Sequence, residues 1–179
     1  MTIALISLDA HWQDAATLRL PAELAGWILE PASLTARLKR HCSAFRVQLL
    51  NERAARLPAF LRPLLSNADA GLLREVILWC DDMPCVYAQS WLPQHTVNRF
   101  KPLADLGERP LGDYIFQQAG LKRGTIEAAE LDLSGALLPG LAAASRCYAR
   151  RSVFQLNDLP LLVAEVFLPA TVQLQAKVA

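Results

Sequence analysis

The segment GLLREVILWCDDMPCVYAQSWLP, residues 71–93, contains two apolar runs separated by four residues that favour a turn. The runs are GLLREVILWC (71–80) and CVYAQSWLP (85–93), and DDMP (81–84) lies between them. Two apolar runs joined by a short turn are typical of a β-hairpin. We therefore expect an antiparallel pair of strands in this part of the chain.

A second hairpin is predicted nearer the carboxyl end. CYARRSVFQL (147–156) and PLLVAEVFLP (160–169) are apolar runs joined at Asn157-Asp158, a pair of residues that suits a tight turn. AFRVQLL (44–50) alternates between apolar and polar residues, which indicates a half-buried strand. The segment KRGTIEAAELDL (122–133) is compatible with a strand or a helix.

Helical patterns come mainly before these strands. Residues 20–30 have apolar positions at helical spacing and are followed by Pro31, which ends a helix. Residues 33–41 predict a second helix with Ser33 as its N-cap. Residues 108–120 predict a turn followed by a short helix.

The order of these elements predicts the fold class. Helices come early and strands later, mostly in hairpins, which favours an α+β fold with an antiparallel sheet over a βαβ arrangement. The chain has 179 residues, no internal repeat and no linker-like segment, so we expect a single domain over residues 1–179. No glycine-rich nucleotide-binding motif occurs, so the sequence gives no support for a nucleotide cofactor.

Composition excludes several classes of function. The formal net charge is +1, so there is no bulk positive charge that would suggest binding to nucleic acid or to an anionic membrane. The uncharged runs are too short to span a bilayer, and the amino end lacks a basic region before its apolar residues, so we expect a cytoplasmic protein. The four cysteines match no zinc spacing and are expected to be free thiols, and we predict no metal site.

Two charged residues stand inside the apolar strands. Glu165 lies in the middle of PLLVAEVFLPA (160–170), and Arg74 occupies an inward-looking position of the first hairpin strand. A carboxylate in an apolar interior is costly unless it is paired or hydrogen-bonded. Two interpretations are open. In the first, the charges form an internal Arg74–Glu165 salt bridge, or one of them lies at the edge of the sheet and faces water. In the second, they line an enclosed pocket in which Arg74 binds a ligand carboxylate and Glu165 handles a proton or a ligand hydroxyl.

Arg150 and Arg151 head the neighbouring strand. Because consecutive side chains of a strand point to opposite faces, at most one of them can face such a pocket. The pattern favours solvent-facing arginines at the start of a strand.

Three segments of the chain match, in order, the motifs of one known family. They are LLREVILWCDDMPCVYAQSWLP (72–93), LGERPLGDYIF (106–116) and ARRSVFQLNDLPLLVAEVFLPA (149–170). Together they resemble the chorismate lyase family of bacterial ubiquinone biosynthesis. The resemblance implies a single α+β domain whose antiparallel sheet, flanked by helices, encloses a ligand pocket under flap-like segments. It also implies a cofactor-independent carbon–oxygen lyase that eliminates pyruvate from chorismate to give 4-hydroxybenzoate, the first step of ubiquinone biosynthesis.

The resemblance also assigns residues. Arg74 matches the family's arginine for the ring carboxylate, and Glu165 matches the glutamate that contacts the hydroxyl end of the ligand. Both are therefore candidate catalytic and substrate-binding residues. Leu111 matches a leucine whose backbone contacts the ligand, and Leu34 falls where the family often has methionine. Gln89 stands where relatives carry arginine, which raises the question of how a second substrate carboxylate is bound.

Functions besides catalysis of this reaction are compatible with the same residues. The fold also serves as the effector-binding domain of a class of transcription regulators, although the residues before the hairpin lack a clustered basic recognition helix. A non-catalytic carrier of a small aromatic acid and a lyase that forms 3-hydroxybenzoate are two more interpretations that the sequence leaves open. The expected partners are chorismate and its product, without nucleic acid or stable membrane insertion, and the expected state is a monomer.

Overall fold

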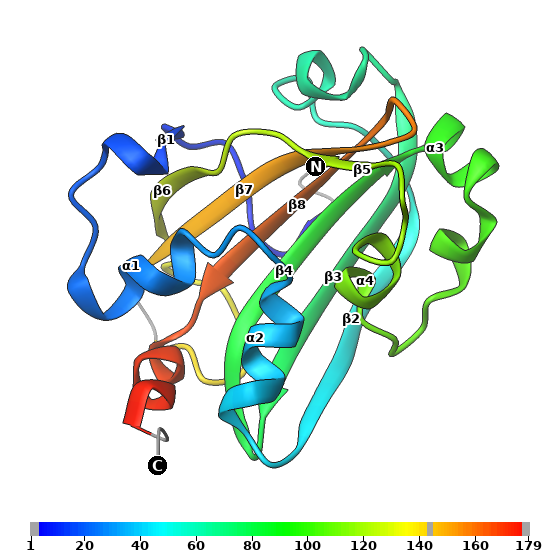
Figure 1. Cartoon of the computed structure of the whole chain (residues 1–179). Coiled ribbons are helices and arrows are strands. Elements are labelled where there is room, and N and C mark those ends of the chain that lie inside the picture. Colours follow the sequence, from blue (N-terminus) through cyan, green and yellow to red (C-terminus); the bar gives the residue numbers. More distant parts are fainter. Residues whose placement is uncertain (1–3, 143–144, 177–179) are drawn as a thin grey trace.

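The computed structural model describes residues 4–142 and 145–176. Eight strands in these residues form one antiparallel sheet in the order β1-β6-β7-β8-β4-β3-β2, with β5 also paired to β7 (Figure 1). The strands are β1 (Gln13–Asp14), β2 (Phe45–Arg56), β3 (Ala70–Cys80), β4 (Met83–Pro93), β5 (Leu121–Arg123), β6 (Glu127–Asp132), β7 (Arg146–Leu156) and β8 (Leu159–Phe167). The predicted α+β class with an antiparallel sheet is confirmed.

Both predicted hairpins are present. The β3–β4 turn is shorter than expected, because Met83 already pairs with Cys80 and Asp81 adopts a left-handed conformation with φ of 54°. Between β7 and β8, Asn157 and Asp158 both have positive φ, as a tight two-residue hairpin turn requires.

The ambiguous segment 122–133 forms strand, not helix. β5 and β6 both pair with β7, in register Arg123↔Phe154 and Glu127↔Arg151. Residues such as those of EAAELD (127–132) have good helix propensity, and pairing with a long neighbouring strand overrides it.

Helices cover one face of the sheet. The α-helices are α1 (Ala22–Ile28), α2 (Leu34–His41), α3 (Gln94–Arg99) and α4 (Leu111–Ile115), and the 3₁₀ helices are η1 (Ala15–Thr17), η2 (Arg62–Leu65), η3 (Lys101–Asp105) and η4 (Pro169–Ala176). Figure 1 shows α1, α2 and α4 in front of the sheet. The Ser33 hydroxyl accepts a hydrogen bond from the Ala36 amide at 3.2 Å, so the predicted N-cap of α2 is confirmed.

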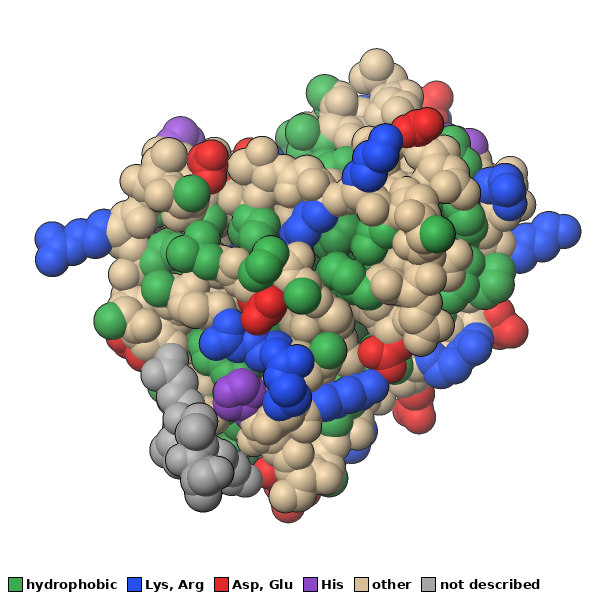
Figure 2. Space-filling model, in the orientation of Figure 1, with side chains coloured by type: hydrophobic (Ala, Val, Ile, Leu, Met, Phe, Trp, Pro, Cys, Tyr) green, Lys and Arg blue, Asp and Glu red, His purple; other side chains and the backbone are tan. Residues whose placement is uncertain are grey.

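The covering helices α2 and α4 meet closely at Gly112. A Cβ atom added there would lie 3.2 Å from the hydroxyl oxygens of both Ser33 and Thr35. Figure 2 shows basic side chains gathered over the region of α2, whose last turn contains Lys39, Arg40 and His41. One exposed ion pair, between Lys39 and Asp113 at 2.7 Å, joins the two helices.

The opposite face of the sheet is covered by irregular segments. Apolar side chains from the amino-terminal segment, from the region of η2 and from the segment after β6 pack against it, namely Ile6, Leu8, Leu57, Leu61, Leu65, Leu133 and Leu138. Within the described residues, no helix combines the length and apolar character needed to cross a membrane.

Candidate active site

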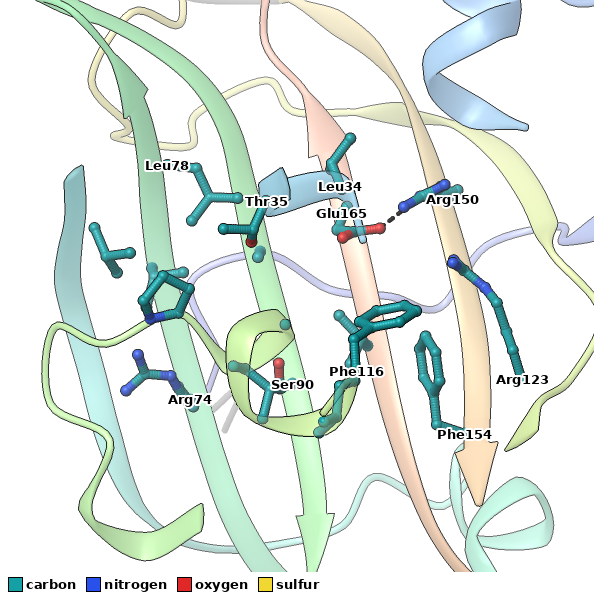
Figure 3. Close-up of a pocket in the computed structure, with 18 residues that line it drawn as sticks. Leu34, Thr35, Arg74, Leu78, Ser90, Phe116, Arg123, Arg150, Phe154 and Glu165 are labelled. Carbon is teal, nitrogen blue, oxygen red and sulfur yellow. Dashed lines mark hydrogen bonds and ion pairs between the residues drawn. The ribbon is translucent and has the colours of Figure 1, made fainter. Parts of the chain in front are cut away.

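A pocket lies between the sheet and the helices α2 and α4 (Figure 3). The space between its lining atoms, including the part open to solvent, is about 550 Å³. Its walls are mostly apolar, and its lining residues are Leu34, Thr35, Val47, Arg74, Val76, Leu78, Ala88, Ser90, Pro110, Leu111, Gly112, Ile115, Phe116, Arg123, Arg150, Phe154, Val163 and Glu165. An apolar pocket with a few convergent charges is the usual form of a site for a small organic ligand.

Arg74 provides a buried cation at one end of this pocket. Its side chain is 2% exposed, and its Nη1 lies 2.7 Å from Oε2 of Glu52 on the neighbouring strand β2. Its Nη2 donates to the carbonyl oxygen of Arg109 at 2.9 Å, in the segment that leads into α4. The guanidinium is thus held at a fixed place between the sheet and the segment that covers it.

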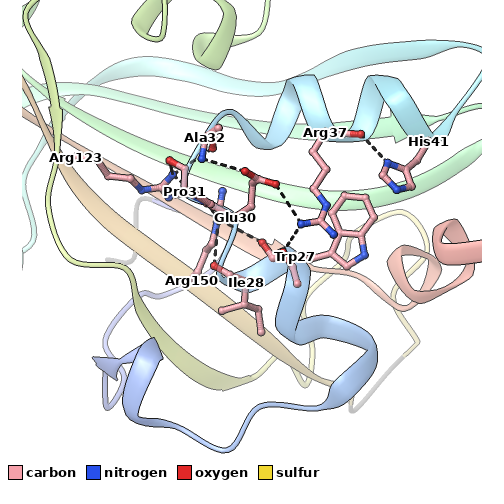
Figure 4. Close-up of polar contacts among 10 residues, drawn as sticks. Trp27, Ile28, Glu30, Pro31, Ala32, Arg37, His41, Arg123 and Arg150 are labelled. Carbon is pink, nitrogen blue, oxygen red and sulfur yellow. Dashed lines mark hydrogen bonds and ion pairs between the residues drawn. The ribbon is translucent and has the colours of Figure 1, made fainter.

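Glu165 provides the carboxylate of the pocket. It lies directly opposite Arg150 in the β7–β8 ladder, and Arg150 Nε donates to Glu165 Oε2 at 2.5 Å (Figure 3). Arg150 Nη1 donates to the carbonyl oxygens of Trp27, Ile28 and Glu30, at 3.3, 3.1 and 2.7 Å (Figure 4). Arg150 therefore fixes both Glu165 and the chain segment that follows α1.

The salt bridge proposed between Arg74 and Glu165 is wrong. Arg74 pairs with Glu52 and Glu165 pairs with Arg150, although both residues line the same pocket as the second interpretation expected. The reason is the strand order, because β4 lies between β3, which carries Arg74, and β8, which carries Glu165.

The interpretation of Arg150 and Arg151 as solvent-facing is also wrong. Arg150 is 1% exposed and lines the pocket. Arg151 is buried on the other face, where it pairs with Glu127 at 2.8 Å and stacks on the ring of Trp12. The expectation that at most one of the two arginines faces the pocket is confirmed.

Arg123 is a pocket residue that sequence reasoning missed. Its Nε donates to the hydroxyl of Ser152 at 3.0 Å, and its guanidinium lies 4.9 Å from the ring centroid of Phe154. Burial, and then the positive charge of Arg150, lower the pKa of Arg123 to about 10. No local pattern could have identified it, because β5 has only three residues and the sequence left this segment open between strand and helix.

Leu34 and Leu111, which the resemblance assigned to ligand contact, both line the pocket. Leu34 is the first residue of α2 and Leu111 the first residue of α4. Their contact with a ligand remains a prediction, but the covering helices do bring both residues to the pocket.

Gln89 does not face the pocket. Its neighbours Ala88 and Ser90 line it, so alternation turns Gln89 to the opposite face of β4. There its amide nitrogen donates to the Ile6 carbonyl at 2.8 Å, and its oxygen accepts from the Trp91 indole at 2.7 Å. Gln89 is therefore not among the residues that line the pocket, and a second substrate carboxylate would have to be bound by other residues.

A second buried carboxylate, Glu75, lies beside Gln89 on that opposite face. It accepts hydrogen bonds from the Tyr87 hydroxyl at 2.5 Å, from the Asn51 amide at 2.7 Å and from the Leu5 backbone at 2.7 Å. Burial and the charge of Glu75 raise the pKa of Tyr87 above its usual range. This network ties the amino-terminal segment to the sheet, away from the pocket.

The pocket suits an anionic organic ligand. Among the described residues, its charged lining consists of three arginines and the single carboxylate of Glu165. In the same part of the chain, no group of three or more His, Cys, Asp or Glu side chains is placed to hold a metal ion. Guanidinium groups bind carboxylates with directed, charge-assisted hydrogen bonds, and a carboxylate can move a proton.

Solved structures identify the class of fold. The effector domain of PhnF from Mycobacterium smegmatis matches with a TM-score of 0.60 and 18% identity, over 77% of this chain and 89% of that one. The C-terminal domain of a histidine utilization repressor from Pseudomonas syringae pv. tomato matches with a TM-score of 0.59 and 11% identity, over 72% and 94%. The chain thus has the α+β fold of these two domains.

Sequence comparison identifies the family within that class. The family model for chorismate lyase matches residues 6–179. A probable chorismate pyruvate-lyase of Pseudoalteromonas translucida is 42% identical over 92% of this chain and 94% of its own length. A chorismate pyruvate-lyase of Hamiltonella defensa is 35% identical over 89% and 86%. The chain belongs to the chorismate lyase family.

Proposed function

We propose that this protein is a lyase that eliminates pyruvate from chorismate and forms 4-hydroxybenzoate. The observation that carries the proposal is that, in a member of this family, one largely apolar pocket contains both the buried cation of Arg74 and the carboxylate of Glu165. Relatives that share 42% and 35% identity carry the name chorismate pyruvate-lyase, one of them as probable.

The positions of the two charges fit the substrate. The ring carboxylate of chorismate and its C4 hydroxyl lie at opposite ends of the ring. A carboxylate bound by Arg74 on β3 directs the opposite end of the ring toward Glu165, two strands away on β8. Neighbouring strands lie about 4.8 Å apart, so two strand spacings are on the order of 10 Å, enough for a six-membered ring between the charges.

The reaction needs two proton transfers. The C3–O bond to the side chain breaks, the C4 proton leaves, and its bonding electrons complete the aromatic ring. The departing enolpyruvate takes a proton at its methylene carbon and becomes pyruvate. Within this proposal Glu165 accepts the C4 proton, because it is the one carboxylate among the described residues that line the pocket.

The test is incubation of the purified protein with chorismate while pyruvate and the aromatic product are measured. Equal amounts of pyruvate and 4-hydroxybenzoate are expected. Formation of 3-hydroxybenzoate would change the reaction assigned, and tight binding of 4-hydroxybenzoate without any turnover would identify a carrier instead.

Variants then test the assigned roles. Glu165→Gln is expected to lower kcat at least about a hundredfold if Glu165 moves a proton. Glu127→Gln is the matched control, because Glu127 also pairs with an arginine of β7, but on the face of the sheet away from the pocket. Equal activity of both variants would remove the proton-transfer role from Glu165.

Two wider features belong to the same proposal. 4-Hydroxybenzoate would supply the aromatic ring of ubiquinone, and the protein would act as a cytoplasmic monomer. Restored ubiquinone synthesis in a bacterium that lacks this activity would support the first feature, and the mass of the protein measured in solution by light scattering tests the monomer.

A further inference from the structure

We propose that Arg123 forms a second anion subsite of the pocket, which binds the carboxylate on the side chain of the substrate. Arg150 supports this subsite by positioning Glu165. The inference rests on the proposed function, since it concerns how the pocket discriminates between a substrate with two carboxylates and a product with one.

The charges around Arg123 leave it without a counter-ion. Two carboxylates lie near it, and each already has its own partner. Glu165 pairs with Arg150 at 2.5 Å, and Glu30 pairs with Arg37 at 3.2 Å. Arg123 forms no ion pair with the described part of the chain, so this end of the pocket carries one uncompensated positive charge.

The guanidinium of Arg123 also has donor capacity to spare. Nε donates to the hydroxyl of Ser152. Nη1 is shared among the carbonyl oxygens of Glu30, Pro31 and Ala32, at 3.4, 3.1 and 3.4 Å (Figure 4). Nη2 makes no hydrogen bond within residues 4–142 and 145–176. A guanidinium with a free Nη and no carboxylate partner is suited to receive an anionic ligand.

Arg150 is less suited to that task. Its Nη2, like that of Arg123, makes no hydrogen bond within the described residues, but its Nε already donates to the carboxylate of Glu165 and its Nη1 to three backbone carbonyls. An approaching carboxylate would also compete with Glu165 for this guanidinium. Arg150 is therefore a positioning residue, and Arg123 is the cation free to contact the ligand.

The geometry of the substrate places its second carboxylate at this end. In chorismate the side-chain ether is on C3, next to the C4 hydroxyl and away from the ring carboxylate on C1. If Arg74 holds the ring carboxylate and Glu165 faces C4, the side chain extends from the Glu165 end. Figure 3 shows Arg123 beside Glu165 and Arg150 at this end of the pocket, with Arg74 at the other.

Burial of a cation without a partner is unfavourable, which is also why the pKa of Arg123 falls to about 10. A ligand carboxylate would supply the missing negative charge. The expectation is therefore that dianionic ligands gain affinity from Arg123, whereas monoanionic ligands held by Arg74 do not.

The test compares two ligands in the intact protein by calorimetry. 4-Hydroxybenzoate carries the ring carboxylate alone, and 3-(carboxymethoxy)-4-hydroxybenzoate adds a side-chain carboxylate in a compound that cannot eliminate. Arg123→Gln is expected to weaken the dicarboxylate about 10- to 100-fold, the range for a lost hydrogen bond to a charged group, and to change 4-hydroxybenzoate less than about threefold. Lys122→Gln removes the same charge from an exposed neighbouring position and is expected to change neither.

Two further variants complete the design. Arg74→Gln is expected to weaken both ligands, and Arg123→Lys to restore part of the affinity for the dicarboxylate. Equal weakening of both ligands by Arg123→Gln, or no weakening of the dicarboxylate, would overturn the subsite. Because binding is measured without turnover, a protein that fails to produce pyruvate would refute the proposed function and leave this comparison intact.

Discussion

The pairing of Arg150 with Glu165 can be tested by a double-mutant cycle. Arg150→Met leaves the Glu165 carboxylate, which is 13% exposed, without its partner, and removes the donor from three backbone carbonyls. Breaking a buried ion pair on one side costs about 3–5 kcal/mol. For a chain of this size 1 kcal/mol corresponds to roughly 2–4 °C, so the unfolding midpoint is expected to fall by about 6–20 °C.

The cycle separates the energy of the Arg150–Glu165 ion pair from the energy of the hydrogen bonds that Arg150 donates to the backbone carbonyls. When Glu165→Gln is already present, Arg150→Met no longer leaves an unpaired charge. The two changes together should then cost about 2–3 kcal/mol less than the sum of the single changes. Free energies of unfolding from urea titrations, analysed at equal m-values, provide the measurement.

Arg74 supplies the matched control. It is also a buried arginine of the pocket, but it pairs with Glu52, so Arg74→Met and Glu165→Gln should be additive within about 0.5 kcal/mol. Strong coupling of Glu165 to Arg74, with weak coupling to Arg150, would refute the pairing and restore the salt bridge that the sequence pattern suggested.

Three other perturbations test the two ends of the pocket and its cover. Glu52→Gln removes the counter-ion of the buried Arg74 and should destabilise the free protein by about 3–5 kcal/mol. 4-Hydroxybenzoate should then raise the unfolding midpoint of this variant more than it raises that of the wild type, and equal increases would contradict the role of Arg74. The pKa of Arg123 is lowered to about 10, so its positive charge is present below that pH. Affinity for the dicarboxylate should therefore fall as the pH rises through about 10. A parallel fall in the Arg123→Gln variant would show that another group is responsible. Gly112→Ala brings a Cβ atom to 3.2 Å from the hydroxyl oxygens of Ser33 and Thr35. The affinity for 4-hydroxybenzoate, measured by calorimetry, should therefore fall several-fold. Unchanged affinity would show that the contact between α2 and α4 is adaptable.

Much of the sheet could be predicted because its signals are local. Two hairpins with short turns, and apolar runs of strand length, are sufficient to predict antiparallel pairing. Alternation also placed Arg74 correctly at an inward position, and the apolar run around Glu165 correctly predicted that this carboxylate is at least partly buried. Which strands lie next to each other is not a local property, and the partner of each charge depends on it.

The role of Arg123 could not be predicted either, because its contacts are not local in the sequence. Its strand β5 has three residues, too few to display alternation, and β5 belongs to the sheet through its pairing with β7. The hydrogen bonds of Arg123 to the segment that follows α1 join residues about 90 positions apart in the chain. Contacts of this separation leave no trace in a pattern of neighbouring residues.

The adjacent residues Arg74 and Glu75 show how one short motif serves two faces of a sheet. Alternation directs Arg74 into the pocket and Glu75 into the network with Tyr87 and Asn51 on the other side. Glu75 and Glu165 are both carboxylates within apolar strands, and their sequence contexts do not distinguish them. Their partners distinguish them, because Glu75 accepts only neutral hydrogen bonds in the described part of the chain, whereas Glu165 pairs with a cation and borders the pocket.

Glu75→Gln should therefore loosen the amino-terminal segment, measured as faster amide exchange at Leu5, and leave the affinity for 4-hydroxybenzoate within about twofold. A large loss of affinity would mean that the two faces of the sheet are coupled.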